Sequence, residues 1–241
     1  MASDPPKIAE GERIALALGA GGARGLAQIG VIQALQARRL EVAAVAGSSS
    51  GALIGGVFAA GKLDVFAQRL AAMTRGEFVR LVAEPSLEQD GLVRGARLVD
   101  AMREVVGDPL IESLPVDFVA VAVDLERQRE VWLRSGPLWQ ALRASFAFPG
   151  VFTPGNVHGR DLVDGGLLAP LPIAATRLSD AHRLIAVDMH GWPDRPGGHP
   201  ADSAAPADAA RPLLERWVLR QLDRVRGGPD TSTMGITEVL G

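Results

Sequence analysis

Short apolar runs alternate with helical patterns through the first quarter of the chain. Residues 13–19 and 42–47 are almost wholly apolar and end in glycine, as short buried strands do. Between them, apolar residues recur at three-residue steps from Leu26 to Leu35, which is the spacing of one helix face. Residues 50–61 predict a second helix made of small residues. This order predicts an α/β fold, with a doubly wound, mainly parallel central sheet and helices on both faces.

The remainder of the first 190 residues predicts further elements of the same domain. Residues 64–113 are mostly helical in pattern, with interruptions near Pro85 and Gly91. The other predicted elements are strands at 116–126 and 129–135, a helix at 137–145, a hairpin at 156–166 that closes on a tight turn, and a strand at 184–190. We therefore place one domain at residues 10–190.

The composition changes after residue 190. Residues 191–212 are rich in Pro, Gly, Ala and Asp, which predicts a loop or linker. Residues 213–226 predict an amphipathic helix with three arginines four positions apart, and residues 227–241 a tail. Such a helix can lie on an anionic membrane. Acidic residues dilute its charge, so packing against protein is the alternative.

Composition and charge exclude several classes of function. The chain has 241 residues, 47% of them hydrophobic, and a net charge of -3, which gives no electrostatic basis for binding nucleic acid. It has no cysteine, and its four histidines lack ligand spacing, so we expect neither a metal site nor a cofactor. With neither a signal-peptide pattern nor an apolar run of membrane-spanning length, we expect a cytoplasmic location, with peripheral membrane contact as an option.

The segment GSSSG at residues 47–51 joins a predicted strand to a predicted helix. It satisfies the pattern G-x-S-x-G, with Ser49 at the centre. On a sharp turn of this kind the serine backbone is strained, and the flanking Gly47 and Gly51 crowd each other, so only very small residues fit. The turn exposes the hydroxyl at a helix N-terminus, which favours a nucleophile. The alternative is a turn in which Ser48 or Ser50 only caps the helix.

The glycine-rich segment GAGGARG at 19–25 also follows a strand and opens a helix. Its backbone N–H groups at Gly21, Gly22 and Ala23 can point at an anion. The glycine spacing differs from G-x-G-x-x-G, and the Lys-Ser/Thr ending of a phosphate-binding loop is missing, which disfavours nucleotides. Beside a nucleophilic serine, we expect an oxyanion hole instead, with Arg24 adding positive charge or bracing the loop.

The third motif is Asp164-Gly165-Gly166, at the end of the predicted hairpin. A turn of this sequence is commonly only structural. A serine nucleophile needs a base, however, and a buried carboxylate with a raised pKa can serve as one near neutral pH.

In this order and spacing, the three motifs resemble the patatin-like phospholipase family, and in particular small bacterial members related to the neuropathy target esterase catalytic domain. The resemblance covers roughly residues 13–190 and includes SFAFPGVFTPG before Asp164. It implies a three-layer α/β sandwich and an acyl hydrolase that cleaves fatty-acyl esters of phospholipids, lysophospholipids or related lipids. It also implies that Ser49 is the nucleophile and Asp164 its sole base, with the amides of residues 21–24 as the oxyanion hole. Ala20 stands where the family often has a glycine.

Two alternatives remain open on the residues alone. One is an esterase with a Ser-Asp-His triad, to which His182 or His190 would contribute. The other is a non-catalytic regulatory protein that keeps the fold. For the acyl pocket we predict apolar residues such as Leu53, Phe58 and Phe146, from their positions.

Overall fold

The computed structural model describes residues 8, 11–74, 76–77, 96–177 and 179–190. All of them belong to the first of two compact units, which spans Met1–Trp192. The predicted linker, C-terminal helix and tail lie outside the described residues, as do Pro85 and Gly91.

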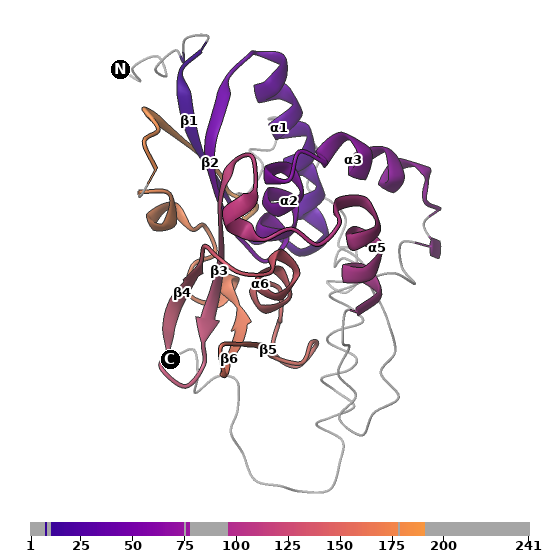
Figure 1. Ribbon diagram of the computed structural model, residues 1–241, viewed down its shortest axis with the longest axis vertical. Helices are drawn as coiled ribbons and strands as arrows, with labels where there is room; N and C mark the ends of the chain where they lie inside the picture. The colour runs from indigo at the N-terminus through magenta and orange to yellow at the C-terminus, as the bar shows by residue number, and fades with distance from the viewer. Residues whose placement is uncertain (1–7, 9–10, 75, 78–95, 178, 191–241) are drawn as a thin grey trace, which may run out of the picture. The chain divides into compact units, whose positions relative to one another are not determined.

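Seven strands form one mixed sheet in the described part of the chain (Figure 1). Four of them are parallel neighbours in the order β7-β1-β2-β3, namely β7 Arg183–Val187, β1 Arg13–Leu18, β2 Glu41–Ser48 and β3 Asp117–Asp124. The other three are antiparallel to their partners, namely β4 Arg129–Leu133, β5 Gly155–Val157 and β6 Arg160–Asp164. The predicted α/β sheet is confirmed. The antiparallel strands all join it through β3, since β4 and β6 pair with β3 and β5 pairs with β6.

Strand β3 is shared by three partners, and this sharing positions the site. β4 pairs with Ala120 to Asp124, so it occupies one edge of β3. Because β2 and β6 each pair with residues that β4 also pairs with, both must lie on the opposite edge. β2 ends with Ser48 opposite Val121, and β6 ends with Asp164 opposite Ala122. The carboxyl ends of β2 and β6 therefore meet head to head along one edge of β3.

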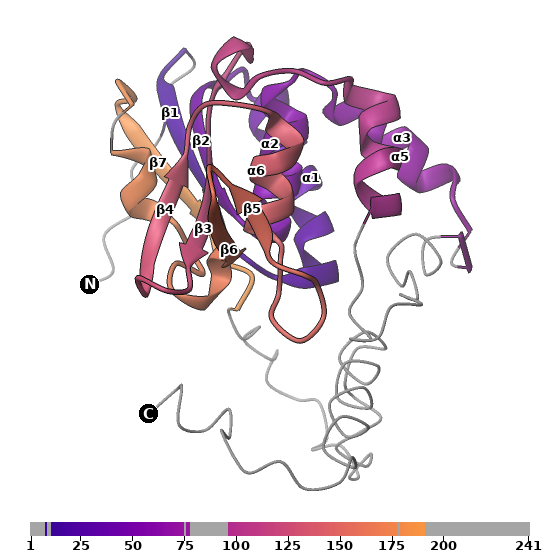
Figure 2. The same ribbon diagram turned by 60° about the horizontal axis from the view of Figure 1, so that its bottom comes forward.

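The α-helices that the structure describes lie on one face of the sheet, and short 3₁₀ helices lie on the other (Figure 2). The α-helices are α1 Ala27–Ala37, α2 Ser50–Ala59, α3 Leu63–Ala72, α5 Ala96–Val106 and α6 Leu138–Ser145. The 3₁₀ helices of the opposite face are η3 Gly165–Leu167 and η4 Ile173–Thr176, whereas η1 Gly22–Leu26 and η2 Ile111–Ser113 lie in connections.

Alternating residues of the central strands pack on opposite faces, and both faces are buried. On β3, Phe118 and Ala120 join the large core under the α-helices. Val119 and Val121 join a smaller cluster with Ala175 of η4. A strand buried on both sides has no need of polar residues in between, which is why the strands appear in the sequence as unbroken apolar runs.

The predicted helix after the glycine loop differs from the observed one at its start. Residues up to Leu26 form a 3₁₀ turn, and the α-helix begins at Ala27. Leu26, predicted on the buried face, is 37% exposed, whereas Gln28 is fully buried. The prediction was wrong here because three-residue steps do not follow one face of an α-helix: at about 100° per residue, Leu26 lies about 120° around the helix from the buried Ile32.

Candidate active site

Ser49 lies at the junction of β2 and α2, in a backbone conformation that only a constrained turn imposes. Its φ is 55° and its ψ is -122°, a region that side-chain-bearing residues seldom adopt. A side chain at Gly47 would overlap the backbone of Gly51 and Ala52, and one at Gly51 would overlap the carbonyl of Leu18. The two glycines of the motif are therefore required by the close approach of backbone to backbone.

Ser49 directly contacts the carboxylate of Asp164. The Ser49 hydroxyl donates to Asp164 Oδ2 at 2.7 Å, and the Gly166 N–H donates to Asp164 Oδ1 at 2.7 Å. Asp164 is 3% exposed. The meeting of β2 and β6 on β3 thus brings together two residues that are 115 positions apart in the chain.

Burial changes the acidity of Asp164. Loss of solvent around the carboxyl raises its pKa to about 6, although the hydrogen bonds from Ser49 and Gly166 act in the opposite direction. The group is ionised at neutral pH, and it holds a proton more strongly than an ordinary aspartate does. These are the properties that a general base needs near pH 7.

The glycines after Asp164 are packed against other parts of the site. A side chain at Gly165 would overlap the Val121 carbonyl of β3. A Cβ at Gly166 would lie 2.9 Å from the Cβ of Ala20, at the start of the glycine-rich loop. The Asp-Gly-Gly turn therefore fits between β3 and that loop.

The glycine-rich loop lies beside the Ser49–Asp164 pair and presents free donors. Gly25 is packed against Ser50, the residue after the nucleophile candidate, so that a side chain there would overlap it. Within the described part of the chain, the amides of Gly21, Gly22 and Ala23 have no hydrogen-bond acceptor. The Arg24 amide donates to the Gly21 carbonyl at 3.1 Å, and its residue is exposed.

Three buried polar side chains lie around the site: Ser48 was considered as a helix cap, whereas Gln28 and Ser145 have no counterpart in the sequence analysis. Gln28 on α1 donates its Nε2 to the Gly19 carbonyl at 2.7 Å, just before the loop. Ser48 donates to the Ala169 carbonyl at 2.6 Å, and Ser145 contacts Ser49 itself. A signal for Gln28 existed, because it lies one turn before Ile32 and thus on the apolar face of its helix.

The two histidines named for a possible triad have hydrogen-bond or ion-pair partners other than the carboxylate. His182 precedes β7, and its amide donates to the Arg13 carbonyl, at the end of the parallel strands opposite to Ser49. His190 is exposed, with its Nδ1 3.4 Å from Asp188 Oδ1. Neither imidazole hydrogen-bonds to Ser49 or Asp164 in the described structure, and His199 lies outside it.

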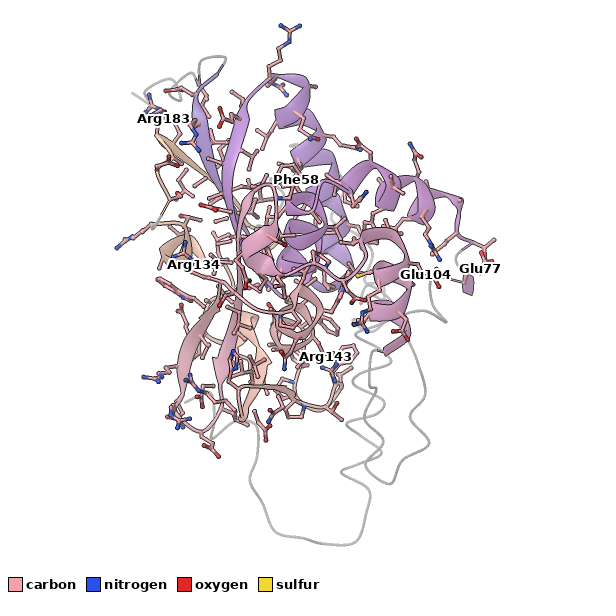
Figure 3. All side chains as sticks on the ribbon, viewed as in Figure 1. Phe58, Glu77, Glu104, Arg134, Arg143 and Arg183 are labelled. Atoms are coloured by element: carbon pink, nitrogen blue, oxygen red, sulfur yellow. The ribbon has the colours of Figure 1, made fainter. Side chains whose placement is uncertain are left out.

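The residues predicted to line an acyl pocket lie in apolar surroundings. Phe58, labelled in Figure 3, and Phe146 are buried in the main core, and Leu53 packs against it. Their contact with an acyl chain stays a prediction. Among the described residues, no group of acidic or histidine side chains could hold a metal ion, and no helix has the length and apolarity needed to cross a bilayer.

The fold and this geometry define the class: an α/β protein with a strained serine at a strand-to-helix turn, hydrogen-bonded to a buried carboxylate. Comparison with known families is more specific. The patatin-like phospholipase family model matches residues 16–177, and the chain belongs to that family.

Relatives of this chain carry NTE names. An uncharacterised NTE family protein of Mycobacterium tuberculosis is 45% identical over 211 residues, which are 87% of this chain and 56% of the relative. A lysophospholipase, nte1, of Emericella nidulans is 32% identical over 187 residues, 74% of this chain and 12% of that protein. The chain thus spans about half the length of the mycobacterial relative and a small part of the fungal one. Among solved structures, VipD from Legionella pneumophila matches with a TM-score of 0.40 and 18% identity, over 66% of this chain and 46% of VipD.

Proposed function

We propose that this protein is a serine acyl hydrolase that uses Ser49 and Asp164 as a catalytic dyad, without metal or cofactor. The observation that carries the proposal is the 2.7 Å hydrogen bond from the Ser49 hydroxyl to a buried carboxylate. The hydroxyl belongs to a residue in a strained elbow, and the raised pKa of Asp164 suits it to accept the hydroxyl proton.

The proposed reaction proceeds in two halves. Ser49 Oγ attacks the ester carbonyl carbon while its proton passes to Asp164 Oδ2. The oxyanion that forms is stabilised by the amides of Gly21, Gly22 and Ala23, where loss of one donor costs about 3 to 4 kcal/mol of barrier. Asp164 then protonates the departing alcohol, which leaves Ser49 as an acyl ester. Asp164 next takes a proton from water as the water oxygen attacks the acyl carbonyl carbon. The bond from this carbon to Ser49 Oγ then breaks, the fatty acid leaves, and Asp164 returns the proton to Ser49 Oγ.

The Arg24 amide has a smaller part in this proposal than the sequence suggests. Its hydrogen bond to the Gly21 carbonyl closes the first turn of the loop, so it orients the other three amides instead of joining them. Its exposed side chain is the cation of the loop.

For the substrate we propose a fatty-acyl ester of a phospholipid, a lysophospholipid or a related lipid. The fungal relative is named a lysophospholipase, which supports this class. Support also comes from the exposed apolar side chains in segments that flank the dyad, which are Leu26, Phe148, Leu167, Leu168 and Ile173. Such residues suit peripheral contact of a cytoplasmic enzyme with a lipid surface.

Two rival functions are separable from this one. A Ser-Asp-His triad would need His190 to reach the carboxylate, because His182 lies at the opposite end of the parallel strands, so His190→Ala would abolish activity under that hypothesis. A non-catalytic regulator would keep the fold without reacting at Ser49.

The deciding experiment is intact-mass spectrometry after exposure to a fluorophosphonate. We expect one adduct on wild-type protein, none on Ser49→Ala, slow formation on Asp164→Asn and wild-type formation on His190→Ala. Circular dichroism of each variant controls for folding. Folded wild-type protein that forms no adduct would overturn the proposal and favour the regulatory function.

A further inference from the structure

Ser145, the last residue of α6, contacts the backbone of the proposed nucleophile Ser49. Ser145 Oγ accepts a hydrogen bond from the Ser49 N–H at 3.1 Å and donates its own proton to the Val121 carbonyl at 2.6 Å. Ser145 is fully buried. Its hydroxyl therefore ties the elbow to β3, the strand on which β2 and β6 meet.

This contact satisfies the backbone amide of the residue that begins α2. Ser49 is the N-cap of α2, yet its side chain makes no capping hydrogen bond, because its hydroxyl points to Asp164 instead. Amides at a helix start need acceptors from elsewhere. Ser145 supplies one to the amide of Ser49, whose φ is positive, so it holds that residue while the Ser49 hydroxyl bonds to Asp164.

The same short segment also holds the carboxylate. The Asp164 N–H donates to the Ala147 carbonyl at 3.0 Å, two residues after Ser145. Residues 145–147 thus bind the backbone of both Ser49 and Asp164.

The segment is itself braced by the side chain of Arg143 (labelled in Figure 3). The Arg143 guanidinium donates to the carbonyl and hydroxyl of Thr153, at 2.7 and 2.6 Å. It lies over the rings of Phe146 and Phe152, which pack edge to face with centroids 5.4 Å apart. The connection between α6 and β5 is therefore fixed on both sides of Ala147.

From this geometry we infer that Ser145 is a positioning residue for the reaction, which sets the direction of the Ser49 hydroxyl toward Asp164 through the Ser49 amide. The inference rests on the proposed dyad. Ser145 touches no reacting atom, so its effect should appear in the rate of the chemical step and not in substrate binding.

The test is Ser145→Ala, measured as fluorophosphonate labelling rate and as kcat and KM on a short-chain p-nitrophenyl ester. We expect the labelling rate and kcat to fall about 10- to 100-fold per folded molecule, the range that misplacement of reacting groups produces, with KM changed less than about twofold. Thr176→Val is the matched control, because Thr176 also has a buried hydroxyl that donates to a carbonyl, that of Ile173 in η4. We expect it to lose stability without loss of rate.

A second measurement separates positioning from general stability. If Ser145 acts through the Ser49–Asp164 contact, then adding Ser145→Ala to Asp164→Asn should lower the residual labelling rate less than about threefold, since the contact is already impaired. A structural role would give the full loss in both backgrounds and would overturn the inference.

Ser145→Cys serves if Ser145→Ala does not fold, because a thiol is a weak donor and acceptor of similar size. We expect an intermediate labelling rate for it, and a wild-type rate would also overturn the inference.

The outcomes distinguish this inference from the proposed function. Wild-type protein that does not label at all removes the dyad, and the inference with it. Wild-type protein that labels while Ser145→Ala labels equally fast leaves the dyad standing and overturns only the role of Ser145.

Discussion

Replacing Asp164 by asparagine should make the protein more stable at neutral pH while it loses activity. In the folded protein the pKa of Asp164 is raised from the ordinary 3.8 to about 6 because the carboxyl is buried. The folded state therefore binds the proton more tightly than the unfolded state does. The ionised carboxylate destabilises the fold at pH 7, and this cost disappears when the pH falls below about 4.

The size of the effect follows from the two pKa values. They differ by about 2 pH units, and each corresponds to about 1.4 kcal/mol, so ionisation costs the folded state about 3 kcal/mol above pH 7. Asparagine avoids this cost but keeps only one acceptor oxygen for the two donors, Ser49 and Gly166, and the lost hydrogen bond offsets about 1 kcal/mol. We expect Asp164→Asn to be more stable than wild type by about 1 to 2 kcal/mol at pH 7.5.

The assay is urea unfolding of both proteins from pH 4 to pH 7.5, followed by circular dichroism. The advantage of the variant should grow by about 2 kcal/mol across this range and level off above about pH 6 to 7, since all other groups titrate alike in both proteins. Ser49→Ala is the control, because it removes a hydrogen bond that lowers the pKa of Asp164. The loss of stability with rising pH should therefore be larger in Ser49→Ala than in wild-type protein. A stability difference that stays constant with pH would show that Asp164 is not desolvated, and would refute the reasoning.

Three further predictions concern rate and packing. The kcat/KM of wild-type protein should fall tenfold per pH unit below about 6 and be level above it, because only ionised Asp164 accepts the Ser49 proton; a profile without this limb contradicts its role as base. His190→Ala should keep this profile and its plateau within about twofold, and a large loss of kcat would restore the triad. Gly51→Ala should lower the free energy of unfolding by about 3 kcal/mol or more, because its Cβ would overlap the Leu18 carbonyl. Gly30→Ala on α1 has open space around it and should raise the free energy of unfolding by about 0.5 to 1 kcal/mol. Equal urea midpoints for the two variants would contradict the packing argument.

Local features of the fold were predictable because their causes lie within a few residues. The strained turn at Ser49 follows from the backbone crowding that Gly47 and Gly51 permit, and glycine at these positions is visible in the sequence. The hairpin that ends at Asp164 follows from alternation and turn residues, and β5 and β6 form it. The family itself was recognisable from three motifs in order, and the family model confirms it.

Tertiary structure alone decided how these motifs meet. No local pattern states that β2 and β6 share one edge of β3, because strand pairing depends on which partners bury the most surface across the whole chain. That pairing sets the 2.7 Å contact of Ser49 with Asp164 and buries the carboxyl enough to raise its pKa. The same holds for Ser145, whose hydroxyl looks unremarkable in the sequence until the fold closes it against Ser49 and Val121. The sequence by itself determined which groups are candidates for the chemistry, and the packing of distant segments determined the distance between Ser49 and Asp164 and the acidity of the carboxyl.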